Sequence, residues 1–318
     1  MTRPRRTLFG HRFGAAPLAV FLAAVLWGCV VDIDIAKHGS MPAMPGDGVT
    51  VYAAGDIADC RKFGPSATGA ARTAALIMAE LHKNGSAAVL TLGDHTYPNG
   101  RPAEFTDCYA PTWGRFKNRT FPSPGNHEYY TKGATGYYGY FGKAAGPDRR
   151  GYYSFTLGNW HVVSLNSNLQ QPLEHHAQLE WLKAELAQHQ SQCTLAYWHH
   201  PVYSSGGHGD NPKMLGAWQI LYAAGADVVL VAHDHDYERF APLDDHGKLD
   251  RMRGVRQFVV GTGGAKLTPF RFRSSNSDGG SNSVHGVLKL VLKETGYKWK
   301  FLPVTPGGFT DRGASLCH

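Results

Sequence analysis

The sequence has few charged residues, few cysteines and no long hydrophobic run. Only 18% of the 318 residues are charged and 42% are hydrophobic, so the chain has enough apolar surface for a folded core and is not of the disordered class. Five cysteines are too few for a disulfide miniprotein, and the 38 glycines do not recur with the collagen period. The apolar stretch at residues 15–28 is short for a membrane span. A globular protein of one or two domains remains.

The N-terminus joins a basic segment to that apolar stretch. Four arginines lie within residues 1–12, and the chain turns polar again at Asp32. This order is typical of a secretory signal, and its end resembles a bacterial lipoprotein signal in which Cys29 receives the lipid. We therefore expect a signal at residues 1–29, a linker at 30–48 and one domain at 49–318. The protein would act outside the cytoplasm and meet the membrane only through a lipid anchor at Cys29; an uncleaved signal anchor is the alternative.

The formal net charge of +7 comes largely from this N-terminal segment. Four of the 32 basic residues lie there, which leaves 28 against 25 acidic residues. So small an excess argues against a nucleic-acid-binding protein, although residues 251–253 and 271–273 are locally basic. The sequence gives no indication of an oligomeric state.

The remaining cysteines are even in number once Cys29 is lipidated or removed with the signal. In an oxidising compartment an even set favours disulfide bonds, and four cysteines allow three connectivities. We favour Cys60 with Cys108 and Cys193 with Cys317. Their spacing lacks the closely spaced pairs of a structural zinc site.

Hydrophobic patterns predict strands that first alternate with helices and then follow one another. This order predicts an α/β fold with two mixed β-sheets, packed as a sandwich and flanked by helices. The predicted strands are residues 49–54, 87–92, 121–123, 152–157, 160–166, 194–198, 228–232, 257–260, 286–292 and 297–304. The predicted helices are residues 68–83, 172–189 and 213–224.

Polar residues stand where five strands end. They are Asp56, the sequence Gly-Asp-His-Thr-Tyr at 93–97, Gly-Asn-His-Glu at 125–128, the pair His199-His200, and His-Asp-His at 233–235. Each fragment alone also fits ordinary turn or surface chemistry. Because ligands bind outside the carboxyl ends of strands in open α/β sheets, we expect the five loops to meet. Their oxygen and imidazole groups suit zinc, manganese or iron, so together they predict a metal site.

In this order the fragments resemble the motifs of the calcineurin-like metallophosphoesterases, in particular the purple acid phosphatases. The family pattern runs Asp-x-Gly, Gly-Asp-x-x-Tyr, Gly-Asn-His-Glu/Asp, a loop with histidine, and Gly-His-x-His. Here Ala58 and Ala232 replace two glycines. Both replacements are small, so they leave the ligands intact and put the local backbone geometry in question. The resemblance extends from about Val49 to the C-terminus.

The resemblance implies a four-layer fold around two metal ions. One ion would bind Asp56, Asp94, Tyr97 and His235, and the other Asp94, Asn126, His199 and His233. An Fe(III) ion with Zn, Mn or Fe(II) is expected, because Fe(III) most readily binds a tyrosine as phenolate. A metal-bound hydroxide would then attack a phosphate ester. His127 and His208 would contact the phosphate, and His127 would also protonate the leaving group.

The other histidines are expected to have supporting or ordinary roles. His200 neighbours a ligand and is expected to point the other way along its strand, and His95 occupies a variable position of its motif. Ordinary sheet or helix-surface positions are expected for His161, His175, His176 and His189.

The function implied is that of an exported phosphatase for small phosphate monoesters. A phosphodiesterase or nucleotidase is the alternative among enzymes, because the segments expected to select the leaving group, 100–119 and 129–140, do not reveal their substrate. Outside enzymes, a metal- or solute-binding lipoprotein would use the same ligands without needing His127 or His208.

Overall fold

The computed structural model describes residues 48–189 and 191–318. The expected signal, the lipid anchor at Cys29 and all of the expected linker except Gly48 lie outside these residues. Among the described residues, no helix has both the length and the apolar character that a membrane crossing requires.

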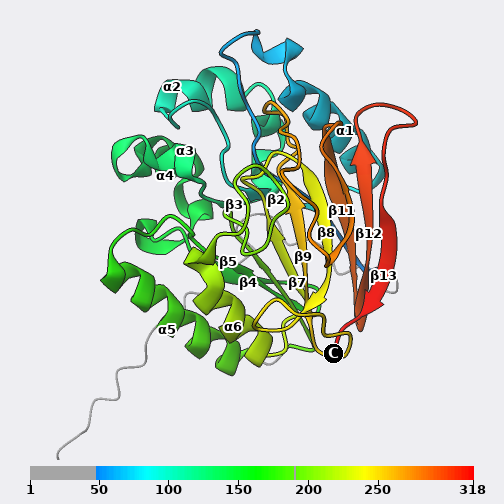
Figure 1. Ribbon diagram of the computed structural model, residues 1–318. Helices are drawn as coiled ribbons and strands as arrows, with labels where there is room; N and C mark the ends of the chain where they lie inside the picture. Colours follow the sequence, from blue (N-terminus) through cyan, green and yellow to red (C-terminus); the bar gives the residue numbers. More distant parts are fainter. Residues whose placement is uncertain (1–47, 190) are drawn as a thin grey trace, which may run out of the picture. The chain divides into compact units, whose positions relative to one another are not determined.

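Two mixed β-sheets form the centre of the domain (Figure 1). The six-stranded sheet has the order β13-β12-β11-β1-β2-β3, and the seven-stranded sheet has the order β10-β8-β9-β7-β6-β5-β4. The strands are β1 (Val49–Ala54), β2 (Ala88–Leu92), β3 (Thr120–Ser123), β4 (Tyr153–Leu157), β5 (Trp160–Ser164), β6 (Cys193–Tyr197), β7 (Val228–Val231), β8 (Tyr237–Leu243), β9 (Val255–Val260), β10 (Ser277–Ser281), β11 (Gly286–Lys293), β12 (Gly296–Pro303) and β13 (Arg312–Leu316).

Parallel pairing brings the carboxyl ends of the inner strands to one edge of each sheet. In the six-stranded sheet β1, β2 and β3 are parallel, and in the seven-stranded sheet β5, β6, β7 and β9 are parallel. Antiparallel strands flank both sets. The loops that follow the parallel strands therefore leave from the same edge of their sheet.

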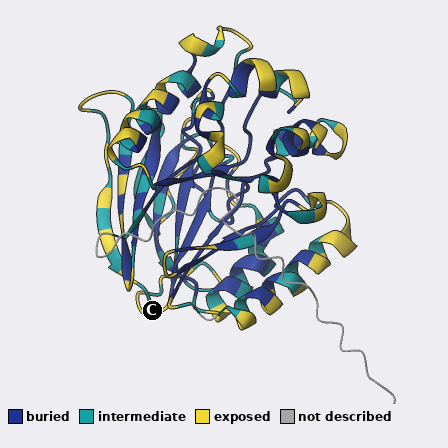
Figure 2. Ribbon diagram, turned by 180° about the vertical axis from the view of Figure 1, so that it is seen from behind, coloured by how far each residue is buried: buried dark blue, intermediate teal, exposed yellow. Residues whose placement is uncertain are grey.

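Helices cover the outer faces of the sheets. The helices are α1 (Gly69–Lys83), α2 (Pro102–Glu104), α3 (Asn126–Tyr129), α4 (Thr135–Phe141), α5 (Pro172–Gln188) and α6 (Leu215–Ala223). Helices α5 and α6 pack on the seven-stranded sheet through Leu182 and Trp218, whereas α1 buries Ile77 and Leu81 in the other core. Figure 2 shows the result, with buried strands between helices whose outer sides are exposed.

Alternation along the strands separates the two cores. In β6, Leu195 and Tyr197 belong to the core between the sheets, whereas Ala196 packs in the core beneath α5 and α6. Hydroxyl groups also cross between the sheets: the Tyr153 hydroxyl of β4 donates to the Pro122 carbonyl of β3 at 2.9 Å. The sandwich is thus held by apolar packing and by a few buried polar contacts.

Both favoured disulfide bonds are confirmed. The Cys60–Cys108 bond joins the segments that follow β1 and β2. The Cys193–Cys317 bond joins the first residue of β6 to the residue after β13, and therefore links the two sheets.

The predicted fold class is confirmed, and most predicted elements lie within two or three residues of the observed ones. Strands β8, β10 and β13 and helices α2 to α4 were not predicted. Strand β8 contains Pro242 and Glu238, which a strand pattern disfavours; the buried Glu238 carboxylate instead accepts hydrogen bonds from the backbone N–H and hydroxyl of Ser205. Strand β10 reads Ser-Asp-Gly-Gly-Ser and is specified by its pairing with β8 rather than by propensity.

Candidate metal centre

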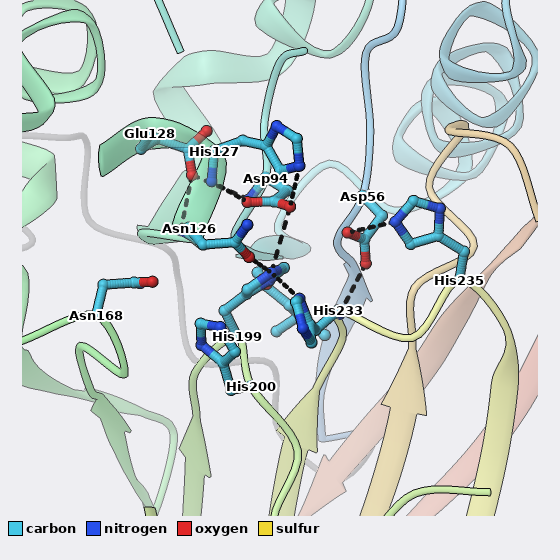
Figure 3. A network of polar contacts seen from close by, with 12 residues as sticks. Asp56, Asp94, Asn126, His127, Glu128, Asn168, His199, His200, His233 and His235 are labelled. Carbon is cyan, nitrogen blue, oxygen red and sulfur yellow. Dashed lines mark hydrogen bonds and ion pairs between the residues drawn. The ribbon is translucent and has the colours of Figure 1, made fainter. Parts of the chain in front are cut away.

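The five polar loops meet at the carboxyl edge of both sheets (Figure 3). Three loops follow β1, β2 and β3 of the six-stranded sheet and bring Asp56, Asp94 and Asn126. Two loops follow β6 and β7 of the seven-stranded sheet and bring His199, His233 and His235. One sheet thus supplies the carboxylates and the amide, and the other supplies the imidazoles.

The first group of side chains gathers around Asp56. The Tyr97 hydroxyl donates to Asp56 Oδ1 at 2.8 Å. His235 Nε2 lies 3.2 Å from both Asp56 Oδ1 and the Tyr97 hydroxyl. These three side chains are mutual neighbours at the spacing of donor atoms that share an ion.

The second group gathers around His199 Nε2. This nitrogen lies 3.1 Å from Asn126 Oδ1 and 3.2 Å from His233 Nδ1. It is also 3.4 Å from Asp94 Oδ2, and the same carboxylate oxygen lies 3.3 Å from the Tyr97 hydroxyl. Asp94 therefore belongs to both groups, so the structure brings the seven predicted ligands close together.

Backbone carbonyls fix which ring nitrogen faces the centre. His199 Nδ1 lies 2.8 Å from the Leu92 carbonyl, and His235 Nδ1 lies 2.7 Å from the Lys266 carbonyl. Since a carbonyl only accepts, each Nδ1 carries the proton, and in the neutral ring each Nε2 presents a lone pair. Both lone pairs face carboxylate, amide or imidazole acceptors, an arrangement that a cation satisfies. The donor set therefore fits metal ions.

The charge of the centre also favours the binding of metal ions. Asp56 and Asp94 are buried, and all their ion pairs among the described residues are with histidines. Burial acts to raise the pKa of Asp94, but His199 and His127 outweigh it and lower the pKa below its usual range. Burial acts to lower the pKa of His199, but Asp94 and Asp56 raise it to about 9. Without a cation, buried carboxylates are thus compensated only by protonated imidazoles.

The backbone is strained at three of these positions. Asp56, Asp94 and His233 have φ angles of 57°, 49° and 71°, in the left-handed region that residues other than glycine rarely adopt. The His233 N–H donates to Asp56 Oδ2 at 2.9 Å, so a hydrogen bond links two of these strained residues. Such conformations cost about 1–3 kcal/mol each and persist where surrounding contacts enforce them, often at functional sites.

Two glycines let the loops approach closely. A Cβ atom on Gly125 would lie 2.1 Å from Asp94 Oδ1, so only glycine fits beside this carboxylate. A Cβ atom on Gly55 would lie 2.6 Å from the Ala232 Cβ. Ala232 replaces a family glycine, and the structure accommodates its methyl group because Gly55 has no side chain.

His127 lies beside Asp94, and His208 lies beside His233. His127 donates from Nδ1 to the Pro98 carbonyl at 2.5 Å, which leaves Nε2 3.8 Å from Asp94 Oδ2. His208 packs beside His233, with ring centroids 4.1 Å apart, and its Nδ1 lies 3.0 Å from Asp234 Oδ1. The His208 side chain is 54% exposed, so it stands at the rim.

The orientation predicted for His200 is wrong. Its ring lies 4.4 Å from that of His233 and 5.0 Å from that of His199, and its Nδ1 lies 2.8 Å from the Ser167 hydroxyl. Because β6 ends at Tyr197, the alternation of a strand no longer applies at this position. His200 thus supports the ligands from the same side.

Two carboxylates in the motif loops, those of Glu128 and Asp234, hold the loops of the centre in place. The sequence analysis assigned neither of them a role. Glu128 is fully buried and accepts N–H donors from Asp94, His95 and Gly125, which clamps the loops after β2 and β3. Asp234 accepts the backbone N–H of His208. Their positions inside the motifs Gly-Asn-His-Glu and His-Asp-His were the only feature of the sequence that could have indicated this role. His95 itself lies in the core and contacts Thr91.

The fold and this arrangement of donors agree with the family relationship found by comparison. Residues 49–237 match the family described as calcineurin-like phosphoesterase, so the chain belongs to that family. Purple acid phosphatase 21 of Arabidopsis thaliana is 32% identical over 161 residues, which cover 46% of this chain and 36% of the relative. The chain thus spans just over a third of that relative's length.

Solved structures show the same fold. A purple acid phosphatase, PPD1 from yellow lupin seeds, superimposes with a TM-score of 0.65 and 18% identity, covering 84% of this chain and 53% of that one. GAP50, described as the anchor in the inner membrane complex of Plasmodium, also has a TM-score of 0.65, with 15% identity and coverage of 85% and 88%. At these identities the likeness concerns the fold alone.

Proposed function

We propose that the chain is an exported phosphatase that hydrolyses phosphate monoesters at a centre of two metal ions. The observation that carries the proposal is the convergence of two donor groups on Asp94, with histidine lone pairs turned inward by backbone carbonyls. One ion would be held by Asp56, Asp94, Tyr97 and His235, and the other by Asp94, Asn126, His199 and His233. When bound, such a pair lowers the pKa of water to give a nucleophile and neutralises phosphate oxygens.

The chain's own residues supply the remaining chemistry. His127 Nε2 faces Asp94 while its Nδ1 proton is held by the Pro98 carbonyl, so Nε2 is the atom that gains or loses a proton. We assign to it the transfer of a proton to the leaving oxygen. His208, oriented by Asp234, would donate to a phosphate oxygen.

We favour a monoester over a diester. A monoester presents three oxygens without an ester substituent, whereas a diester presents two and needs room for a second organic group. His127 and His208 are two donors beside the donor groups of the ions, and a monoester offers them the larger set of free oxygens. A phosphodiesterase or nucleotidase remains the alternative to test.

Tyr97 bears on the identity of the ions. Burial raises the pKa of Tyr97 well above its usual value, and Asp56 and Asp94 raise it further. Only a strongly charged cation offsets these influences and binds the phenolate, which favours Fe(III) at this position with Zn, Mn or Fe(II) as its partner. The phenolate, two carboxylates and the attacking hydroxide would supply four negative charges against five positive charges of the ions, which would leave about one positive charge for the substrate.

The test is a paired measurement on purified protein. Metal content is determined per chain, and kcat/KM is compared for p-nitrophenyl phosphate and bis-(p-nitrophenyl) phosphate. We expect two ions per chain at the centre and about 100-fold preference for the monoester. Faster hydrolysis of the diester would establish the phosphodiesterase alternative, and no turnover above a metal-free control would leave a metal-binding protein.

Export has its own test. The two disulfide bonds are compatible with an oxidising compartment. We expect the mature protein in the cell envelope, and Cys29→Ser to release it from the membrane fraction if residues 26–29 direct lipidation. Recovery of the wild-type protein in the cytoplasm with its signal intact would contradict export.

A further inference from the structure

A second group of metal-binding side chains lies at the opposite edge of the seven-stranded sheet. His161 is the second residue of β5, near the start of the strand, whereas the candidate metal centre follows the strand ends. Glu185 belongs to the last turn of α5, and His189 follows that helix directly. None of the three contacts a residue of the centre among the described hydrogen bonds and ion pairs.

The local sequence explains why the three side chains meet. His161 and Val163 alternate onto the face of β5 that α5 covers. Leu182 and Glu185 lie on the buried side of α5, and His189 follows Glu185 by four residues, which places it one turn further along the same side. The helix therefore presents a carboxylate and an imidazole to a histidine of the strand.

The three ligand atoms are close enough to share one ion. Glu185 Oε1 lies 3.1 Å from His161 Nε2 and 3.0 Å from His189 Nδ1. All three atoms lie within 4.8 Å of one another. Ligands about 2.0–2.2 Å from a zinc ion in a tetrahedral site are separated by similar distances.

Several polar contacts meet at Glu185 Oε1. The Ser154 hydroxyl donates to it at 2.5 Å, and His161 Nε2 and His189 Nδ1 lie 3.1 and 3.0 Å from it. His189 Nδ1 also lies 3.2 Å from the backbone carbonyl of Glu185, a contact that it would exchange for the ion. A cation between the two imidazole nitrogens and the carboxylate oxygen would leave the serine hydrogen bond in place.

We propose that His161, Glu185 and His189 bind one divalent transition-metal ion, with zinc as the preferred ion, at a site separate from the two-metal centre. Two neutral imidazoles and one carboxylate suit zinc, and water would complete its coordination. The only ion pairs of Glu185 among the described residues are with these histidines, so its charge lacks a fixed cationic partner. The His189 side chain is 33% exposed, which gives the ion a route from solvent.

The test uses zinc and the full chain. Bound zinc per chain is measured after equilibration with a competing chromophoric chelator, for the wild type and for His189→Gln. His176→Gln is the matched control, because His176 is an exposed histidine on the same helix. We expect His189→Gln to lose one zinc ion per chain, with affinity weakened roughly 100-fold or more, while His176→Gln retains it. Activity toward p-nitrophenyl phosphate should be unchanged in both variants.

Equal zinc content in the wild type and His189→Gln would overturn the proposal. A second measurement does not depend on the folding of a variant: crystals of the wild type in zinc, measured at the zinc absorption edge, should show an anomalous peak between His161, Glu185 and His189. A peak at the two-metal centre but none at this position would also overturn it. Because this result does not depend on catalysis, the site and the proposed phosphatase function fail or succeed separately.

Discussion

The two histidine clusters differ in how their rings are held. At the centre, the Nδ1 atoms of His199 and His235 donate to backbone carbonyls while Nε2 faces the carboxylates. In the cluster of α5 and β5, His161 Nδ1 is buried and has no hydrogen-bond partner among the described residues, and His189 Nδ1 lies 3.2 Å from the Glu185 backbone carbonyl as well as facing the carboxylate. The first cluster has its metal-facing nitrogens freed in advance, whereas the second must give up a contact of His189 to bind an ion.

The two clusters have similar donor atoms, but those of the centre are more strongly preorganised for binding an ion. A second hydrogen bond orients a metal-binding histidine and selects its free nitrogen, which lowers the cost of binding. Strained backbone at Asp56 and Asp94 adds a further constraint at the centre. We therefore expect tight binding and catalysis at the centre, and weaker, exchangeable binding at the cluster of α5 and β5.

The largest effect expected is that of removing the shared carboxylate. Asp94→Ala should lower kcat/KM by about four powers of ten or more and release metal from the centre, because the side chain serves both donor groups. Glu185→Ala is the counterpart in the other cluster and should leave kcat/KM within about twofold. Steady-state kinetics with metal analysis measures both. Two ions retained at the centre of Asp94→Ala would refute the bridging role.

His127 separates catalysis from metal binding within the centre. His127→Ala should lower kcat by about two to four powers of ten, as expected for the loss of a proton donor, while metal content stays unchanged. His176→Ala is the control, because His176 is an exposed histidine outside the centre. If His127→Ala instead loses metal, His127 acts as a ligand.

The Cys60–Cys108 disulfide restrains two loops of the centre, whereas neither disulfide involves the cluster of α5 and β5 directly. It closes a segment of 48 residues that contains Asp94, and in the chain-entropy model a loop of this length stabilises the fold by about 4 kcal/mol. We expect Cys60→Ser combined with Cys108→Ser to lower the free energy of unfolding by up to this amount, measured by denaturant titration. Four reactive thiols in unreduced wild-type protein would show that neither bond forms.

Among the substitutions at the centre, the smallest effect on turnover is expected for Tyr97→Phe. This substitution keeps the buried ring but removes the phenolate oxygen. If Fe(III) occupies the first site, the wild type absorbs visible light through charge transfer and the variant does not, whereas hydrolysis falls by only about tenfold or less because Asp56, Asp94 and His235 remain. A colourless wild type with two zinc or manganese ions would contradict the assignment of iron.

The sequence allowed the fold class, the disulfide pairing and the convergence of the motif residues to be predicted. The fold class and the convergence rest on local signals, namely apolar strands and polar residues at their ends. The even set of cysteines predicts disulfide bonds but leaves three connectivities open, of which the favoured one forms. The orientation of His200 was not predictable in this way, since it depends on where β6 ends and on Ser167 from another loop. Helices α2 to α4 also escaped prediction.

Tertiary contacts, rather than helix propensity, specify helix α4. Helix α4 reads Thr-Gly-Tyr-Tyr-Gly-Tyr-Phe, a poor helix former by composition. Its Tyr137 and Phe141 are buried against one another and against His95, and the Tyr137 hydroxyl donates to the Pro122 carbonyl at 3.0 Å. Such long-range contacts leave no periodic pattern in the sequence.

Because its donors come from loops of both sheets, the distances within the candidate centre depend on how the two sheets are aligned. A slide of 1 Å between the sheets would change separations of about 3 Å between carboxylates and imidazoles by up to a third. The Cys193–Cys317 bond joins the sheets at the other end of the strands, and near the centre they are joined by contacts such as the Ser123 hydroxyl donating to the Leu165 carbonyl at 2.8 Å. Substitutions in the buried contacts between the sheets, such as Tyr153 with Pro122, should therefore detune the centre from a distance. Gentle denaturation should likewise release ions before the strands themselves unfold.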